Sequence, residues 1–133
     1  MTRGIRNNNP GNIDHNPANK WQGQLPHDEK IEKRFCRFES PEHGIRALMK
    51  LLCNYHKGGY QSVAKMIDRW APNNENNTSA YIKGVAQSLG VDPHQVLAVD
   101  KPTLIALAKS IIRHENGQQP YSEATFEKAY GML

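Results

Sequence analysis

Apolar residues recur three or four positions apart from position 40 onward, and this spacing predicts a series of amphipathic helices. The first helix begins at Ser40 and Pro41, a capping residue followed by one suited to the first helical position, and ends at Gly58. The apolar positions that predict the first three helices are Ile45, Leu48, Met49 and Leu52, then Val63, Met66, Ile67 and Trp70, then Tyr81, Ile82, Val85 and Leu89.

Capping signals separate the remaining helices. We expect the second helix to stop at Ala71 and Pro72, followed by a polar loop over 73–77. We expect Thr78 to cap the third helix and Gly90 to close it. A fourth helix is predicted over about 101–115, and a fifth begins after the capping residue Ser122. The fourth and fifth carry apolar stripes made of Leu104, Leu107, Ala108, Ile111 and Ile112, and of Phe126, Ala129 and Tyr130.

The segment 7–38 lacks this periodicity and is rich in Asn, Gly and Pro, which is typical of turns. Within it, 33–38 alternates basic and aromatic residues and predicts a strand, so we expect a small β-hairpin between Trp21 and Phe38. The sequence therefore predicts one mainly α, α+β domain over 1–133, with an irregular hairpin region at 7–38 and a helical region at 40–133.

Composition narrows the function without choosing it. A net charge of +4 suits a polyanionic partner, either nucleic acid or an anionic cell wall. No apolar run reaches the roughly 20 residues that span a bilayer, and the N-terminal basic residues are not followed by the apolar stretch of a secretory signal. Cys36 and Cys53 are expected to be free thiols, and the scattered histidines predict neither a metal site nor any other cofactor.

Glu115 is the first candidate for chemistry. It continues the apolar stripe of the fourth helix, and Asn116 and Gly117 then form a strong helix stop. Desolvation and the negative end of the helix dipole both favour the neutral form of such a carboxyl, which is what a general acid needs. A solvated residue at a frayed helix end is the alternative interpretation.

Two separated pieces of the chain, one over 8–81 and one over 108–120, carry a resemblance to lysozyme-like domains. The run from Arg3 to Ile13 is similar to the opening of small proteins of tailed phages and prophages, and Ala108–Gly117 with Pro120 resembles the acid-bearing helix of lytic transglycosylases. The remaining similarity is to glucosaminidase-type domains and lies in Asn8–Ile13, Trp21–Gln22–Gly23, Phe35 to Ile45, Leu51–Leu52, Trp70–Ala71–Pro72 and Asn76–Asn77–Thr78 with Tyr81.

In lysozyme-like enzymes the acid-bearing helix precedes the asparagine-rich turn, whereas here it follows. The resemblance therefore implies a circularly permuted lysozyme-like domain, in which the chain start lies beside the end of the helix of Glu115. It further implies that Glu115 protonates a glycosidic oxygen. For a second carboxylate we favour Asp28 over Asp14, Glu29 and Glu32, and a solvated turn at 28–29 is the competing interpretation.

The resemblance also suggests residues that would bind the substrate. Asn9, Asn12, Trp21, Gln22 and Tyr81 offer the planar amides and aromatic faces that sugars need. Four of them have a structural alternative: the two asparagines could shape the turn, and the two aromatic residues could belong to the core.

Three functions follow from these observations. The first is a lysozyme-like glycosidase, a muramidase or lytic transglycosylase with glucosaminidase activity as a further option, that cleaves peptidoglycan glycan strands. The second is a non-catalytic phage virion or wall-binding protein on the same scaffold. The third is a helix-turn-helix protein using Arg69 and Lys83, which the long connection from Trp70 to Thr78 argues against.

The leading hypothesis sets the expected context of the protein. We expect a monomer, made in the cytoplasm without a signal peptide, that acts in the periplasm or cell wall after delivery by a phage, a holin or a secretion system. The partners would be the glycan strands together with a delivery apparatus or an immunity protein, without nucleic acid and without insertion into a membrane.

Overall fold

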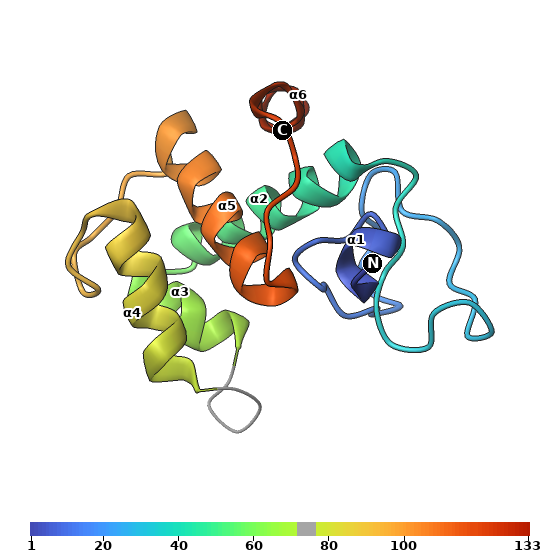
Figure 1. The fold of residues 1–133 in the computed structure, drawn as a ribbon. Coiled ribbons are helices and arrows are strands. Elements are labelled where there is room, and N and C mark those ends of the chain that lie inside the picture. The colour runs from blue at the N-terminus through green and yellow to red at the C-terminus, as the bar shows by residue number, and fades with distance from the viewer. Residues whose placement is uncertain (72–76) are drawn as a thin grey trace.

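The computed structural model describes residues 1–71 and 77–133 and is mainly helical (Figure 1). Five of its helices correspond to those predicted, and a short one at the N-terminus was not predicted. In the described residues the helices are α1 (Arg3–Arg6), α2 (Pro41–Lys57), α3 (Val63–Trp70), α4 (Thr78–Leu89), α5 (Lys101–Asn116) and α6 (Glu123–Gly131).

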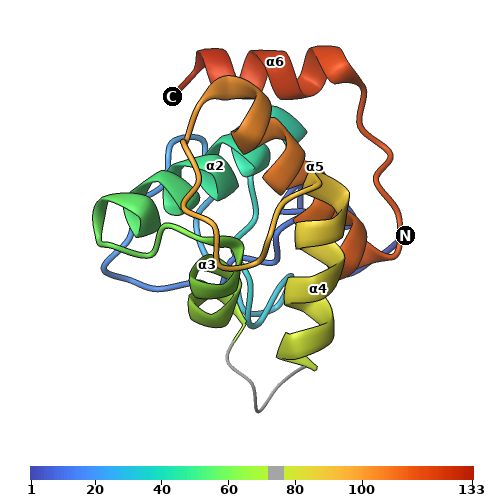
Figure 2. The ribbon, with the colours of Figure 1, turned by 90° about the vertical axis from the view of Figure 1, so that its left-hand side faces the viewer.

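The predicted apolar stripes meet in one large core. Helix α2 packs against α3, α5 and α6, and α4 packs against α3 and α5 (Figure 2). The stripe of α5 is buried from Leu104 to Ile112, as are Ile45 to Leu52 on α2. A second, smaller core of Ile13, Cys36, Phe38 and Ala47 joins the N-terminal segment to α2.

Side-chain caps fix the starts of α2, α3, α5 and α6; the cap at Ser62 was not predicted. Ser40, Ser62, Asp100 and Ser122 each accept a hydrogen bond from a backbone N–H three residues on, which satisfies a group that the helix itself leaves unpaired.

The cap of α4 was predicted wrongly. Asn77 is the N-cap, because its side-chain oxygen accepts from the N–H of Ala80, whereas the hydroxyl of Thr78 donates to the carbonyl of Ala71 at 2.9 Å. Helix α3 ends at Trp70, as expected. Pro72 and most of the predicted loop at 73–77, including Asn76 of the motif, lie outside the described residues.

The predicted hairpin between Trp21 and Phe38 is not formed. In place of a ladder, the described residues contain two isolated antiparallel bridges, Asp14 with Phe35 and Gln24 with Phe38. The expected strand at 33–38 changes partner halfway, since Cys36 bonds to Ile13 while the N–H of Leu25 bonds to the carbonyl of Arg37. Within 1–71 and 77–133, no two segments stay adjacent long enough to pair as strands.

The structure bears on the predictions about the cysteines and about membrane-spanning helices. Both cysteines are free, with Cys36 buried and Cys53 partly buried, and burial raises the pKa of the Cys36 thiol to about 11. Among the helices described, none has the length and apolar character that crossing a bilayer requires.

Candidate functional site

Glu115 lies in the last turn of α5, where the apolar stripe reaches the surface. The helix ends at Gly117, which adopts the left-handed conformation with a φ of 72°. The carboxylate is partly exposed, and both of its oxygens are held: the side-chain amide of Asn12 donates to Oε1 at 3.1 Å and the hydroxyl of Tyr81 donates to Oε2 at 3.1 Å. Two donors far away in the sequence therefore fix its direction.

The chain start packs against this helix end, which confirms the predicted proximity of the two. The hydroxyl of Thr2 donates to Asn116 Oδ1 at 2.7 Å, and Asn116 Nδ2 donates to the carbonyl of Pro10 at 2.8 Å. Gly4 sits so close that a Cβ added there would lie 2.7 Å from Asn116 Oδ1. Figure 2 shows the N-terminus beside the chain that leaves α5.

Asn12 reaches Glu115 because the turn that carries it has an unusual backbone. Its φ of 52° lies in the left-handed region, which asparagine tolerates better than most residues. The turn itself is held by Asn9, whose amide donates to the carbonyls of Ile13 and Cys36 and whose oxygen accepts from the N–H of Ile13. The left-handed turn thus aims the Asn12 amide at the carboxylate.

Tyr81 is fully buried and serves both the core and the site. Its ring stacks on that of His114 with 3.5 Å between centroids, while its hydroxyl reaches Glu115. Burial raises the pKa of Tyr81 well above its ordinary value, and the negative charge of Glu115 and the hydrogen bond to it act in the same direction. A side-chain hydrogen bond with Trp70 acts the other way. The phenol is therefore a permanent donor at neutral pH.

A groove of about 430 Å³ opens beside Glu115. Its walls come from the N-terminal segment, from α2 and α3 and from the end of α5, and aromatic and amide side chains are prominent among them. The lining consists of Gly11, Asn12, Ile13, Asp14, Asn16, Asn19, Trp21, Leu51, Tyr55, Arg69, Trp70, Ala71 and Glu115. Its size and mixture of apolar and polar groups suit a small-molecule or oligomer ligand.

The groove gathers some of the predicted site residues and not others. Glu115, Asn12 and Trp21 line the groove, and Tyr81 donates a hydrogen bond to Glu115 from behind this lining. Asn9 is fully buried within the turn, which is the structural alternative given for it, and Gln22 is exposed outside the groove.

The favoured second carboxylate, Asp28, does not reach Glu115's groove. It is exposed, and its side chain accepts from the N–H of Lys30 while its carbonyl accepts from that of Glu32, so it stabilises a solvated turn. The hairpin that was to carry Asp28 toward the groove does not form in the described residues. Asp14 shares the groove instead and is paired with Arg34 at 2.7 Å.

Glu32, another predicted candidate, is a buried structural carboxylate. Its side chain is 1% exposed and accepts five hydrogen bonds, from Arg3 Nε and Nη2, from Asn7 Nδ2, and from the N–H groups of Arg34 and Phe35. The hydrogen bond from Arg3 contributes most to holding its pKa far below the usual glutamate value. It is thus unavailable as an acid or base.

The sequence reasoning missed Leu51, Tyr55 and Arg69 as groove residues. Leu51 and Tyr55 are four positions apart on α2, so helical spacing alone places them on one face. Nothing in the local pattern marks that face as the one next to Glu115. Among the described residues, no group of three or more histidine, cysteine, aspartate or glutamate side chains is arranged to hold a metal ion.

No family model matches the chain. The chain is similar to Protein P5 of Pseudoalteromonas phage PM2, with 37% identity over 131 residues, which cover 96% of this chain and 79% of that protein.

Proposed function

We propose that this chain, which belongs to the family of Protein P5 from Pseudoalteromonas phage PM2, cleaves glycan strands. We propose further that it does so as a phage protein. The observation that carries the proposal is the setting of Glu115: one carboxylate at a groove wall, held through both oxygens by Asn12 and Tyr81. The side chains at positions 12, 81 and 115 are far apart in the sequence and come together to orient one carboxyl group. This arrangement favours a chemical role for Glu115 over that of a residue that merely ends a helix.

The groove has the chemistry of a sugar-binding site. Trp21, Tyr55 and Trp70 provide aromatic faces against which the apolar face of a pyranose can pack. Asn16 and Asn19 provide amides that donate to and accept from hydroxyl and acetamido groups. The net charge of +4 suits an anionic cell wall, so we propose the peptidoglycan glycan strand as the substrate.

In the proposed mechanism Glu115 gives its proton to the glycosidic oxygen as the bond to the anomeric carbon breaks. Asn12 and Tyr81 hold the carboxyl in position, and they stabilise the carboxylate that remains after the proton has left. Asp14 is a second acidic residue among the described residues that line the groove, and it forms an exposed ion pair with Arg34. It would stabilise the positive charge that develops on the sugar, or accept a proton from the attacking water.

The second candidate is a non-catalytic phage virion or wall-binding protein that uses the same groove without cleaving anything. The similarity to a phage protein favours this function more than it favours an enzyme, because it supports the phage association and carries no chemistry. Under either function we propose that the protein meets the periplasm or cell wall through phage delivery, as a monomer that takes no cofactor.

Incubation with purified peptidoglycan separates the two candidates. We expect the wild-type chain and the control Glu29→Gln, an exposed glutamate outside the groove, to release soluble fragments at equal rates. Glu115→Gln should lower the rate at least about 100-fold, the usual contribution of a general acid. Mass spectrometry of the fragments then identifies the bond and separates hydrolysis from anhydro-sugar formation.

Two other outcomes would redirect the proposal. If Glu115→Gln cleaves as fast as wild type, Glu115 is not the acid, and Asp14 becomes the residue to replace. If the folded wild-type chain cleaves nothing, the non-catalytic function replaces the enzymatic one, and binding of intact peptidoglycan becomes the relevant measurement.

A further inference from the structure

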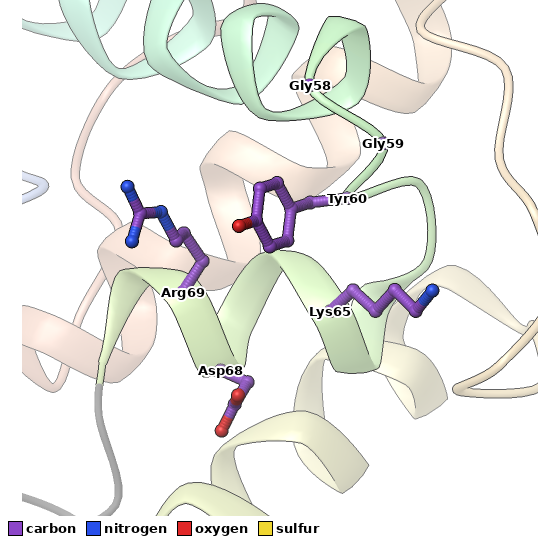
Figure 3. A pocket seen from close by; sticks show the side chains of 6 residues that line it. All are labelled: Gly58, Gly59, Tyr60, Lys65, Asp68 and Arg69. Atoms are coloured by element: carbon purple, nitrogen blue, oxygen red, sulfur yellow. The ribbon is translucent and has the colours of Figure 1, made fainter.

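A second hollow, of about 410 Å³ (Figure 3), has one of its described lining residues in common with the groove of Glu115. The shared residue is Arg69, on α3. The lining of this second hollow consists of Gly58, Gly59, Tyr60, Lys65, Asp68 and Arg69. Arg69 therefore borders both cavities.

Tyr55, Tyr60 and Arg69 form a connected cluster at the junction. The guanidinium carbon of Arg69 lies 5.5 Å from the centroid of the Tyr60 ring, and the rings of Tyr55 and Tyr60 meet edge to face at 6.2 Å. Tyr55 lines the groove and Tyr60 lines the second hollow. One aromatic side chain of each cavity thus contacts the other, and Arg69 lies over the ring of Tyr60.

The arginine presents its charge to the solvent. Arg69 and Tyr60 are both exposed, and Tyr60 retains 38% of its surface. Within 1–71 and 77–133, no carboxylate lies within ion-pair distance of Arg69. In Figure 3 the Tyr60 hydroxyl points toward Arg69, whereas Asp68 and Lys65 extend away from the pair.

We propose that Tyr60 and Arg69 form a subsite for a carboxylate-bearing substituent of the glycan strand bound in the groove. The guanidinium fork matches a carboxylate through paired N–H donors, which a lysine cannot reproduce. The Tyr60 ring supports the guanidinium and offers an apolar face to the substituent. This inference rests on the proposed function, because it assumes that a glycan occupies the groove. Such a subsite would favour strands that carry acidic peptide stems over neutral strands.

Titration calorimetry with two tetrasaccharide probes tests the subsite. The first probe is a neutral N-acetylglucosamine tetramer, and the second is a peptidoglycan tetrasaccharide that keeps its peptide stems. All proteins are full-length and carry Glu115→Gln, so that the probes stay intact. The variants are Arg69→Gln and Tyr60→Leu, with Lys65→Gln as a control that removes an equal charge from the same hollow. Thermal melts confirm that each one folds.

We expect Arg69→Gln to weaken binding of the peptide-bearing probe about five- to tenfold, the range of a charge-assisted hydrogen bond at a partly solvated site. Tyr60→Leu should weaken it about threefold, an estimate from the loss of an aromatic support. Both changes should weaken binding of the peptide-bearing probe more than binding of the neutral probe, and Lys65→Gln should affect neither probe.

The contrary outcomes are distinguishable. If Arg69→Gln leaves both affinities unchanged, weakens both equally, or matches Lys65→Gln, there is no carboxylate subsite, while glycan binding in the groove stands. If neither probe binds any of the proteins, the proposed function fails, and the subsite fails with it.

Discussion

The buried carboxylate of Glu32 should contribute more to stability than any exposed ion pair of this protein. It ties helix α1 to the irregular segment, because Arg3 and Asn7 bond to it from one side and the N–H groups of Arg34 and Phe35 from the other. Replacing it with glutamine keeps the shape and removes the charge. The new amide NH₂ group must then face at least two of the N–H donors that now point at a carboxylate oxygen.

The cost of Glu32→Gln can be worked out from these contacts. Each buried donor left without an acceptor costs about 1–3 kcal/mol, and breaking a buried ion pair costs about 3–5 kcal/mol. Arg3 is half exposed, so water replaces part of what its side chain loses. We therefore expect a loss of about 3 kcal/mol in the free energy of unfolding, which lowers the melting temperature of a chain of this size by about 10 °C.

Urea unfolding followed by tryptophan fluorescence measures this loss, with Asp14→Asn as the matched control. Both ion pairs have an N–O distance of 2.7 Å, but the side chain of Asp14 is 61% exposed and that of Glu32 is 1% exposed. Because an exposed pair contributes little, the control should change stability by less than about 1 kcal/mol. The midpoint should shift in Glu32→Gln while the slope stays constant.

The pH dependence provides a second check. The pKa of Glu32 is lowered in the folded state, so the unfolded chain binds its proton first as the pH falls. The stabilisation by this group is complete above the ordinary value of 4.5 and is lost as the pH falls toward the folded value. The gap between wild type and Glu32→Gln should therefore shrink below about pH 4.5. A loss under about 1 kcal/mol at pH 7, or a gap constant down to pH 3, would refute the reasoning.

Two further predictions concern packing and the site. Gly44→Ala should destabilise the protein by at least about 3 kcal/mol or prevent folding, because the new Cβ would lie 1.8 Å from the backbone oxygen of Asn8. Gly84→Ala, with open space around it, should instead stabilise α4 by about 0.5–1 kcal/mol. Circular dichroism melts compare the two variants, and equal effects would contradict the packing argument. Tyr81→Phe keeps the buried ring but removes the hydrogen-bond donor to Glu115. Peptidoglycan cleavage should therefore slow about tenfold while the melting temperature changes little. Unchanged turnover would show that this hydrogen bond does not position the acid.

Whatever acts within one or two helical turns could be predicted from the sequence. The apolar stripe of α5 and the stop at Gly117 are both where the pattern placed them, because periodic burial and left-handed capping depend on neighbouring residues. The same reasoning locates Glu115 at the end of a buried stripe. Capping at Asn77 instead of Thr78 is an error of one residue, caused by two adjacent side chains that could both cap.

The segment before α2 followed no such local rule. Its alternation predicted a strand, but its backbone hydrogen bonds go to several different partners, among them the side chains of Asn9 and Glu32. Helix α1 has four residues and no apolar stripe, so it depends on contacts such as those of Thr2 with Asn116 and Arg3 with Glu32.

The candidate site divides along the same line. Sequence by itself determined that a carboxylate ends a buried helix and that asparagine and aromatic residues are available to surround it. Only the tertiary structure decided that Asn12 and Tyr81 reach Glu115 and that Asp14, not Asp28, shares its groove. The physical reason is the sequence distance over which each effect acts. Periodicity and capping depend on residues that are close in the sequence. The site is formed by segments that are far apart in the sequence, and the packing of the whole core decides which of them meet.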